Sequence, residues 1–260
     1  MLSTEMKPVD FGRVSEDYAA YRPGLPSSFY DRLERIRRIR GSRSLDLATG
    51  TGTVALELAT RGSSVVGIDI SAGQVEAAER LSRERRLEDR VTFKVADAAS
   101  TGLTDDSFDL VTASQCWHWF DRDAVMNEIR RLLRPGGVLA VIHHAYVTGH
   151  SPLTRDTESL ILEFNPSWPM AGGNGTFPDE IDDVIRGGFR FVEQFSYDDE
   201  VTFTHDAWVG RIRTCNGVGP SLSPTEVRRF DERLAELLRE KYPDPVGVPH
   251  RVWCVVASNG

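Results

Sequence analysis

The segment Leu45–Gly52, Leu-Asp-Leu-Ala-Thr-Gly-Thr-Gly, constrains the fold more than any other part of this chain. A short apolar run leads into two glycines, and the apolar pattern of Val54–Leu58 follows them. Glycine lets the backbone turn sharply and approach a ligand closely. The segment therefore predicts a strand, a tight turn and a helix, with a ligand at the turn.

The acid inside this segment, Asp46, indicates the charge of that ligand. Gly50, Gly52 and Ala55 also fit the dinucleotide pattern G-x-G-x-x-G/A, which would place a pyrophosphate at the turn. A carboxylate repels a pyrophosphate but attracts the ammonium and sulfonium groups of S-adenosylmethionine. The turn therefore favours S-adenosylmethionine, and a nicotinamide dinucleotide is the alternative.

Two further acids follow apolar runs that are typical of buried strands. Asp69 ends the run Val65–Asp69, a position from which a carboxylate can accept hydrogen bonds from a ribose. The alternative is a helix N-cap, because Ser71 and a helical pattern follow. Asp97 ends the run Val91–Asp97, where it can accept from an adenine amino group; the alternative is a turn residue.

The elements expected up to residue 145 alternate between strand and helix. Strands are expected near 43–48, 64–69, 91–95, 108–114 and 137–143, and helices near 26–40, 53–61, 72–86 and 121–134. Such alternation predicts a parallel sheet with helices on both faces, and a ligand site at the carboxyl ends of the strands.

The pattern changes after residue 145. Residues 146–178 are rich in glycine and proline and predict a helical lid with a loop over the site. A helix is expected at 179–187, one or two strands at 189–203, mostly helix at 204–242, and a strand at 251–257. The expected organisation is an N-terminal segment and helix (1–42), a cofactor-binding core (43–145), the lid (146–178) and a C-terminal half of the sheet (179–260) carrying a helical insertion on the substrate side (204–242).

Together these motifs resemble the class I S-adenosylmethionine-dependent methyltransferases. Asp46–Gly52 is similar to their first motif, Phe108–Ser114 to their fourth strand, and Leu132–Leu139 to the turn before their fifth. The resemblance implies a doubly wound, Rossmann-like α/β fold. It also implies a seven-stranded, mostly parallel sheet with an antiparallel last strand and a helical lid.

Three segments are similar to the small-molecule methyltransferases of the trans-aconitate methyltransferase type: Asp17–Pro26, Gln115–Asp121 and Trp208–Thr214. The resemblance implies that strand ends, together with the segment before the sheet, bind S-adenosylmethionine and its product S-adenosylhomocysteine. The implied contacts are Tyr18, Arg22, Asp46, Ala48, Thr49, Gly50, Asp69, Ile70, Asp97, Ala98, Ser114 and Gln115. For Tyr18 and Arg22 the alternative is helix packing and a solvated guanidinium.

The segment after the fourth strand supplies the expected acceptor site. Trp117 and Trp119 offer an apolar wall, and His143 at the end of the fifth strand is expected to line it. His118 is the candidate acid or base, with a structural role as its alternative. If the acceptor is a carboxylate, Arg211 or Arg213 offers a planar fork to anchor it, and a solvated helix surface is the alternative.

The expected reaction is methyl transfer to a small molecule by in-line displacement, giving an O-methyl or N-methyl product. A carboxylate acceptor is already ionised at neutral pH, whereas a hydroxyl or amine benefits from a base. Two other functions stay open: an NAD(P)-dependent oxidoreductase that uses the same glycine turn, and a non-catalytic protein that binds S-adenosylmethionine.

The composition of the chain limits the classes of partner that we expect. The 260 residues carry a formal net charge of −8, which argues against a general nucleic-acid binder. No apolar stretch reaches the roughly 18 residues of a membrane helix, so no membrane partner is expected. Three cysteines without paired spacing predict no disulfide framework and no metal site, and they suit a reducing cytoplasm. A monomer or a homodimer is expected.

Overall fold

The computed structural model describes residue 17 and residues 20–260. The predicted cofactor residue Tyr18 lies outside the described residues. The strands are β1 Arg43–Leu47, β2 Ser64–Asp69, β3 Val91–Val95, β4 Phe108–Ser114, β5 Leu133–Tyr146, β6 Arg190–Phe203 and β7 Val246–Ser258. The helices are α2 Ser27–Ile36, α3 Thr53–Thr60, α4 Ala72–Arg85, α5 Arg122–Leu132, α6 Pro152–Phe164, α7 Asp179–Arg186, α8 His205–Arg213 and α9 Pro224–Lys241, with short 3₁₀ turns η2 Trp117–Trp119 and η3 Thr148–His150.

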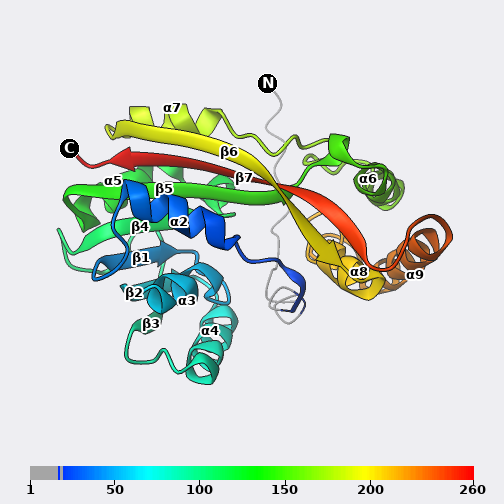
Figure 1. Cartoon of the computed structure of the whole chain (residues 1–260), viewed down its shortest axis with the longest axis horizontal. Helices are drawn as coiled ribbons and strands as arrows, with labels where there is room; N and C mark the ends of the chain where they lie inside the picture. The colour runs from blue at the N-terminus through cyan, green and yellow to red at the C-terminus, as the bar shows by residue number, and fades with distance from the viewer. Residues whose placement is uncertain (1–16, 18–19) are drawn as a thin grey trace. The chain divides into compact units, whose positions relative to one another are not determined.

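The seven strands form one sheet in the order β3-β2-β1-β4-β5-β7-β6 (Figure 1). The first five strands pair in parallel, and β7 runs against its neighbours β5 and β6. The strand order reverses beside β1, where β2 lies on one side and β4 on the other. In open α/β sheets this switch point, at the carboxyl ends of the strands, is where ligands bind. The predicted Rossmann-like fold with an antiparallel last strand is confirmed.

Side chains that alternate along the strands build a hydrophobic cluster on each face of the sheet. One cluster packs α2, α3 and α4 against residues such as Leu110 and Ala140. The other packs α5 and α7 against residues such as Val111 and Val141. In β7, Val252, Cys254 and Val256 face the first cluster, whereas Trp253, Val255 and Ala257 face the second. The sheet is therefore doubly wound, as the period-two burial of its central strands requires.

The chain divides into two compact units. The larger unit contains residues 24–145, 175–197 and 251–260, and it holds both clusters on the sheet. The smaller unit contains the described residues up to Pro23 together with 146–174 and 198–250. Its own core joins α6, α8 and α9 through buried residues that include Trp208, Phe230 and Leu234. The lid role expected for residues 146–178 stays a prediction.

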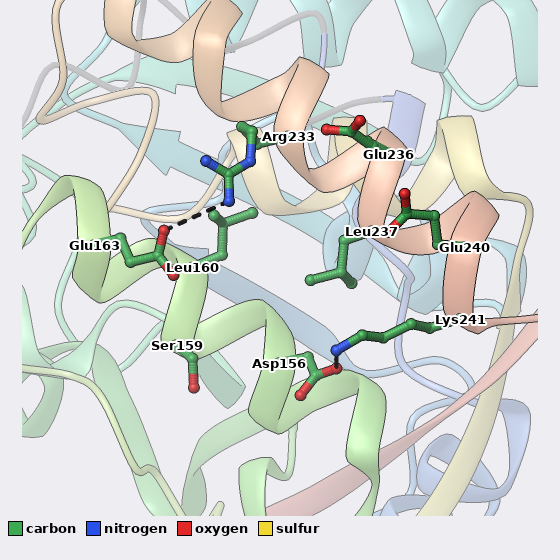
Figure 2. Close-up of a pocket in the computed structure, with 9 residues that line it drawn as sticks. All are labelled: Asp156, Ser159, Leu160, Glu163, Arg233, Glu236, Leu237, Glu240 and Lys241. Atoms are coloured by element: carbon green, nitrogen blue, oxygen red, sulfur yellow. Dashed lines mark hydrogen bonds and ion pairs between the residues drawn. The ribbon is translucent and has the colours of Figure 1, made fainter.

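Inside the smaller unit, a groove of about 340 Å³ runs between α6 and α9 (Figure 2). Lys241 lies 3.0 Å from Asp156, and Arg233 lies 3.8 Å from Glu163, so two ion pairs bridge the helices. None of the predicted site residues is among those that line it: Asp156, Ser159, Leu160, Glu163, Arg233, Glu236, Leu237, Glu240 and Lys241. This groove is a surface feature of the helix pair.

The fifth strand is longer than predicted. It begins at Leu133, directly after α5, whereas the sequence predicted a start near 137. Leu133 pairs with Phe108 and Val138 with Leu110, so the residues between them bulge out of the ladder. Gly136 takes a φ of +73° there, which explains why a glycine stands in this bulge. The region 189–203, predicted as one or two strands, is the single strand β6.

Within residue 17 and residues 20–260, no helix combines the length and the apolar character that crossing a membrane requires.

Candidate active site

The glycine turn is built around a buried carboxylate. Asp46 is 2% exposed, and its two oxygens accept hydrogen bonds from the hydroxyls of Thr49 (2.6 Å) and Thr112 (2.7 Å). Ala48 and Gly50 both have positive φ values, +47° and +56°, as the sharp turn out of β1 demands. Asp46 is therefore enclosed by the turn and hydrogen-bonded to the two threonines.

The environment of Asp46 opposes its ionisation. Burial raises the pKa of this carboxyl to about 6, and the two threonine hydrogen bonds only partly offset that effect. A positive charge above the turn would lower the pKa again, because it stabilises the carboxylate. The site is therefore suited to a cationic ligand and poorly suited to a phosphate.

Asp69 joins the glycine turn to the next loop. Its Oδ2 accepts the amide of Gly50 and its Oδ1 accepts the amide of Ser71, each at 2.9 Å. Ser71 is itself the N-cap of α4, so Asp69 is not the N-cap that the sequence left open. Each carboxylate oxygen can accept a second hydrogen bond, so the residue keeps acceptor capacity for a ribose.

Beyond Asp69, the ends of β2 and β3 present surface to solvent. Ile70 is 76% exposed, an unusual state for isoleucine, and Asp97 is exposed as well. The Oδ1 of Asp97 accepts the amide of Ala99 at 2.8 Å, and Ala98 is buried beside it. An apolar side chain next to strand-end carboxylates offers a face and acceptors of the kind that a nucleoside needs.

The two glycines of the turn serve different purposes. A Cβ added to Gly50 would meet no atom within 4 Å. At Gly52, with a φ of +82°, the added atom would lie 2.8 Å from the ring of Phe93 and 3.1 Å from Ala78. Gly50 therefore leaves open space, whereas Gly52 allows α3 to pack closely.

We expect Gly52→Ala to destabilise the protein by about 1–3 kcal/mol, because it adds left-handed strain to a contact that is too short. Gly50→Ala adds the backbone strain alone, so it should lower the free energy of unfolding by less. Urea unfolding of both variants measures the difference. Equal losses would show that the contact with Phe93 relaxes without cost.

The fourth strand ends in a strained residue beside the fifth. Gln115 has a φ of +60°; its amide donates to the carbonyl of Ile142 at 2.9 Å, and its Nε2 donates to the carbonyl of His144. Ser114, which pairs with Ile142, is half-buried. Left-handed geometry at a non-glycine residue is held in place by such bonds, and it often marks a functional position. Ser114 and Gln115 thus share the carboxyl edge of the sheet with Asp46 and Asp69.

The structure separates the two tryptophans of the expected acceptor wall. Trp117 is 0% exposed, and its indole Nε1 donates to Asp183 at 3.0 Å. This geometry corresponds to packing in the core. Trp119 and His118 are half-buried on η2, with ring centroids 4.7 Å apart. The surface that a ligand could touch is therefore carried by these two residues.

His143 is part of a buried pair that the sequence did not reveal. Its Nε2 lies 2.7 Å from Oε1 of Glu180, and its ring stacks on Phe177 at a centroid distance of 3.7 Å. The His118 ring lies 6.3 Å from it. Glu180 lies in the first turn of α7 and Phe177 lies just before this helix, both more than 30 residues further along the chain, where no sequence motif points to β5. Only the folded sheet brings them together.

The predicted residues outside the larger unit are engaged locally. Arg22 donates through Nε to the hydroxyl of Thr214 at 2.9 Å, within the smaller unit. Arg213 forms ion pairs with Asp17 and Asp231. A contact between Arg22 and a cofactor carboxylate remains a prediction.

Residues 45–141 match the family described as methyltransferase domain. The methyltransferase GfsG of Streptomyces halstedii is 44% identical over 110 residues, which are 42% of this chain and 40% of that protein. The 27-O-demethylrifamycin SV methyltransferase of Amycolatopsis mediterranei is 39% identical over 148 residues, which are 56% of this chain and 54% of that protein. The chain thus spans about half the length of the curated relatives it matches.

Solved structures share the fold. A protein of Anaeromyxobacter dehalogenans, provisionally assigned as a type II methyltransferase, aligns with a TM-score of 0.65 and 24% identity, over 92% of this chain and 98% of that one. The geranyl diphosphate C-methyltransferase of Streptomyces coelicolor, solved with S-adenosylhomocysteine, aligns with a TM-score of 0.52 and 16% identity, over 91% and 79%. Residues 45–141 therefore contain a methyltransferase domain, and the chain has the Rossmann-like fold of the class I S-adenosylmethionine-dependent methyltransferases.

Proposed function

We propose that this chain transfers a methyl group from S-adenosylmethionine to a small-molecule acceptor. The observation that carries the proposal is the arrangement of three acids, Asp46, Asp69 and Asp97, at the ends of the adjacent strands β1, β2 and β3. Asp46 and Asp69 accept hydrogen bonds from the glycine turn, which is open above Gly50. The match of this region to the methyltransferase domain supports the same conclusion.

The residues present fit a nucleoside with a positive charge. In the proposed complex, Asp69 accepts hydrogen bonds from the ribose and Asp97 accepts from the adenine amino group. Ile70 covers one face of the adenine, which would account for its exposed side chain. Asp46, which no ligand atom needs to touch, favours the ammonium and sulfonium groups through its charge.

We assign the acceptor to the side of the sheet edge formed by His118, Trp119 and His143. S-adenosylmethionine supplies an electrophilic methyl group; the acceptor oxygen or nitrogen forms a bond to this carbon as the bond from carbon to sulfur breaks. The half-buried His118 takes the acceptor's proton when the acceptor is a hydroxyl or an amine. A carboxylate acceptor needs no such step. His143, which is 2% exposed and held by Glu180, supports the wall.

Calorimetric titration with S-adenosylhomocysteine and with NADH tests the donor site. We expect binding of the first and none of the second. Asp69→Ala should weaken S-adenosylhomocysteine by roughly 10- to 100-fold, the loss of a hydrogen bond to a charged group. Glu76→Ala, on the exposed face of α4, is the control. Binding of NADH alone, or unchanged affinity in a folded Asp69→Ala protein, would refute the assignment.

Isotopically labelled S-adenosylmethionine with a panel of cell-extract metabolites, read by mass spectrometry, identifies the acceptor. With a hydroxyl or amine acceptor, His118→Asn should lower kcat by roughly 10²- to 10⁴-fold and remove the ascending acid limb of the pH–rate profile. His143→Asn should retain that limb. A pH-independent loss in His118→Asn would show that this histidine has a structural role. Tight donor binding without methyl transfer to any acceptor would favour a non-catalytic binding protein.

A further inference from the structure

Arg211 is a buried cation in the core of the smaller unit, and the proposed methyl transfer does not use it. Its side chain lies on α8 and is 2% exposed. Nη1 donates to the sulfur of Cys215 at 3.3 Å, and the guanidinium carbon lies 5.7 Å from the ring centroid of Tyr146. Nε is buried and donates to no acceptor. Among the residues that the structure describes, Nη2 donates to none either.

A neighbour on the same helix shows how unusual this is. Arg213 is more exposed, yet it has two carboxylate partners: Asp17 at 2.8 Å and Asp231 at 2.9 Å. Arg211 has no carboxylate within 4.0 Å in the described part of the chain. A guanidinium keeps its charge under all physiological conditions, so a buried one without an anion is costly.

Glu158, a buried carboxylate of the same unit, does not fill this role. Its Oε1 accepts the hydroxyl of Thr148 and its Oε2 accepts the amide of Gly172, both at 2.7 Å. Its oxygens therefore hold the segments on either side of α6, and no ion pair joins it to Arg211 in the described part of the chain. One edge of the Arg211 guanidinium therefore has no hydrogen-bond acceptor among the described residues.

That open side is the edge formed by Nε and Nη2, whose parallel N–H bonds match the two oxygens of a carboxylate. The ring of Tyr146, over which the guanidinium lies, packs edge-on against Trp208 at a centroid distance of 5.6 Å, so this part of the core is apolar. One guanidinium balances one monoanion; a phosphate dianion would require a second cation. We propose that Arg211 binds the carboxylate of a small molecule in the smaller unit.

The inference can be tested on the wild-type protein by ¹⁵N NMR of the arginine Nε–Hε groups during titration with sodium acetate. The Arg211 resonance, assigned from its absence in Arg211→Met, should shift saturably. The Arg213 resonance, whose partners are already in place, should not move. Arg211→Met replaces an unpaired buried charge by an apolar chain of similar length, so it should fold. Acetate binding, measured by calorimetry, should weaken at least tenfold in this variant.

Control titrations use sodium chloride at equal ionic strength and sodium phosphate. No shift with acetate, an equal shift with chloride, or a larger shift with phosphate than with acetate would each overturn the inference. A parallel titration with S-adenosylhomocysteine keeps the two proposals apart. Binding of S-adenosylhomocysteine without a response of Arg211 to acetate refutes only the carboxylate site. A response of Arg211 without binding of S-adenosylhomocysteine refutes only the methyl-donor site.

Discussion

Replacing Trp117 with alanine is expected to lower the free energy of unfolding by about 3–5 kcal/mol, the range for deleting a large aromatic side chain from a core. The residue is 0% exposed, and its ring packs edge-on against Phe120 at a centroid distance of 5.9 Å. The change also leaves the buried carboxylate of Asp183 without one of its donors, although Arg122 and Arg186 still pair with it. Urea unfolding at neutral pH measures the loss.

Trp119→Ala is the matched control, since this tryptophan lies two residues away and is half-buried. We expect it to cost about 1 kcal/mol in stability and to weaken acceptor binding instead. Affinity for S-adenosylhomocysteine should be unchanged in both folded variants. If Trp117→Ala keeps its stability but loses acceptor affinity, Trp117 belongs to the acceptor wall after all.

Replacing Asp46 with asparagine is expected to remove a pH dependence of stability. In the folded protein the pKa of Asp46 is about 6, above the ordinary value of 3.8, so the fold binds this proton more tightly than the unfolded chain does. The wild type should therefore lose stability as pH rises from about 4 to 6, by about 3 kcal/mol for a shift of about two units. Above pH 6 the loss is complete. Urea unfolding of both proteins between pH 4 and 8 gives the difference.

Asp109 provides a control whose effect on stability changes with pH in the opposite direction. The amide of Arg43 and the guanidinium groups of Arg134 and Arg37 hold the pKa of Asp109 below its usual value against a desolvation that acts the other way. Its contribution to stability is present at neutral pH and is lost as pH falls through the folded pKa. Asp109→Asn should thus be less stable than the wild type at pH 7. If the free energies of unfolding of Asp46→Asn and of the wild type changed with pH in the same way, the pKa of Asp46 would not be raised in the fold.

The ionisation of Asp46 should also affect the affinity for the ligand. S-adenosylmethionine prefers the ionised form of Asp46, so its affinity should fall by up to roughly tenfold between pH 7 and 5. Asp46→Asn should bind more weakly at pH 7 and show a flatter profile.

The sequence could predict those parts of the site in which a residue of suitable chemistry directly follows a strand. Asp46, Asp69 and Asp97 each follow an apolar run, and parallel strands bring their carboxyl ends to one edge. The pairing of His143 with Glu180 and Phe177 could not be predicted, because it depends on where α7 returns to the sheet. Nor could the burial of Trp117, whose indole packs in the core and donates to Asp183, 66 residues away.

The long C-terminal region shows a similar limit. Apolar residues recur at helical spacing in α9, and three of them, Phe230, Leu234 and Leu238, are buried. The residues that pack against them come from α8 of the same insertion and from α6, which the sequence placed in the lid segment. Periodicity reveals which face of a helix is buried, but not the element that covers it.

The position of β7 has a consequence for biosynthesis. Within this sequence it is the final strand to leave the ribosome, yet it lies between β5 and β6 and supplies side chains to both faces of the sheet. Until β7 emerges, β5 and β6 of a nascent chain lack the strand that pairs with both of them, and the apolar layer on each face of the sheet is incomplete. Stalled or shortened chains should therefore be strong chaperone clients, because exposed strand edges and apolar surface promote aggregation.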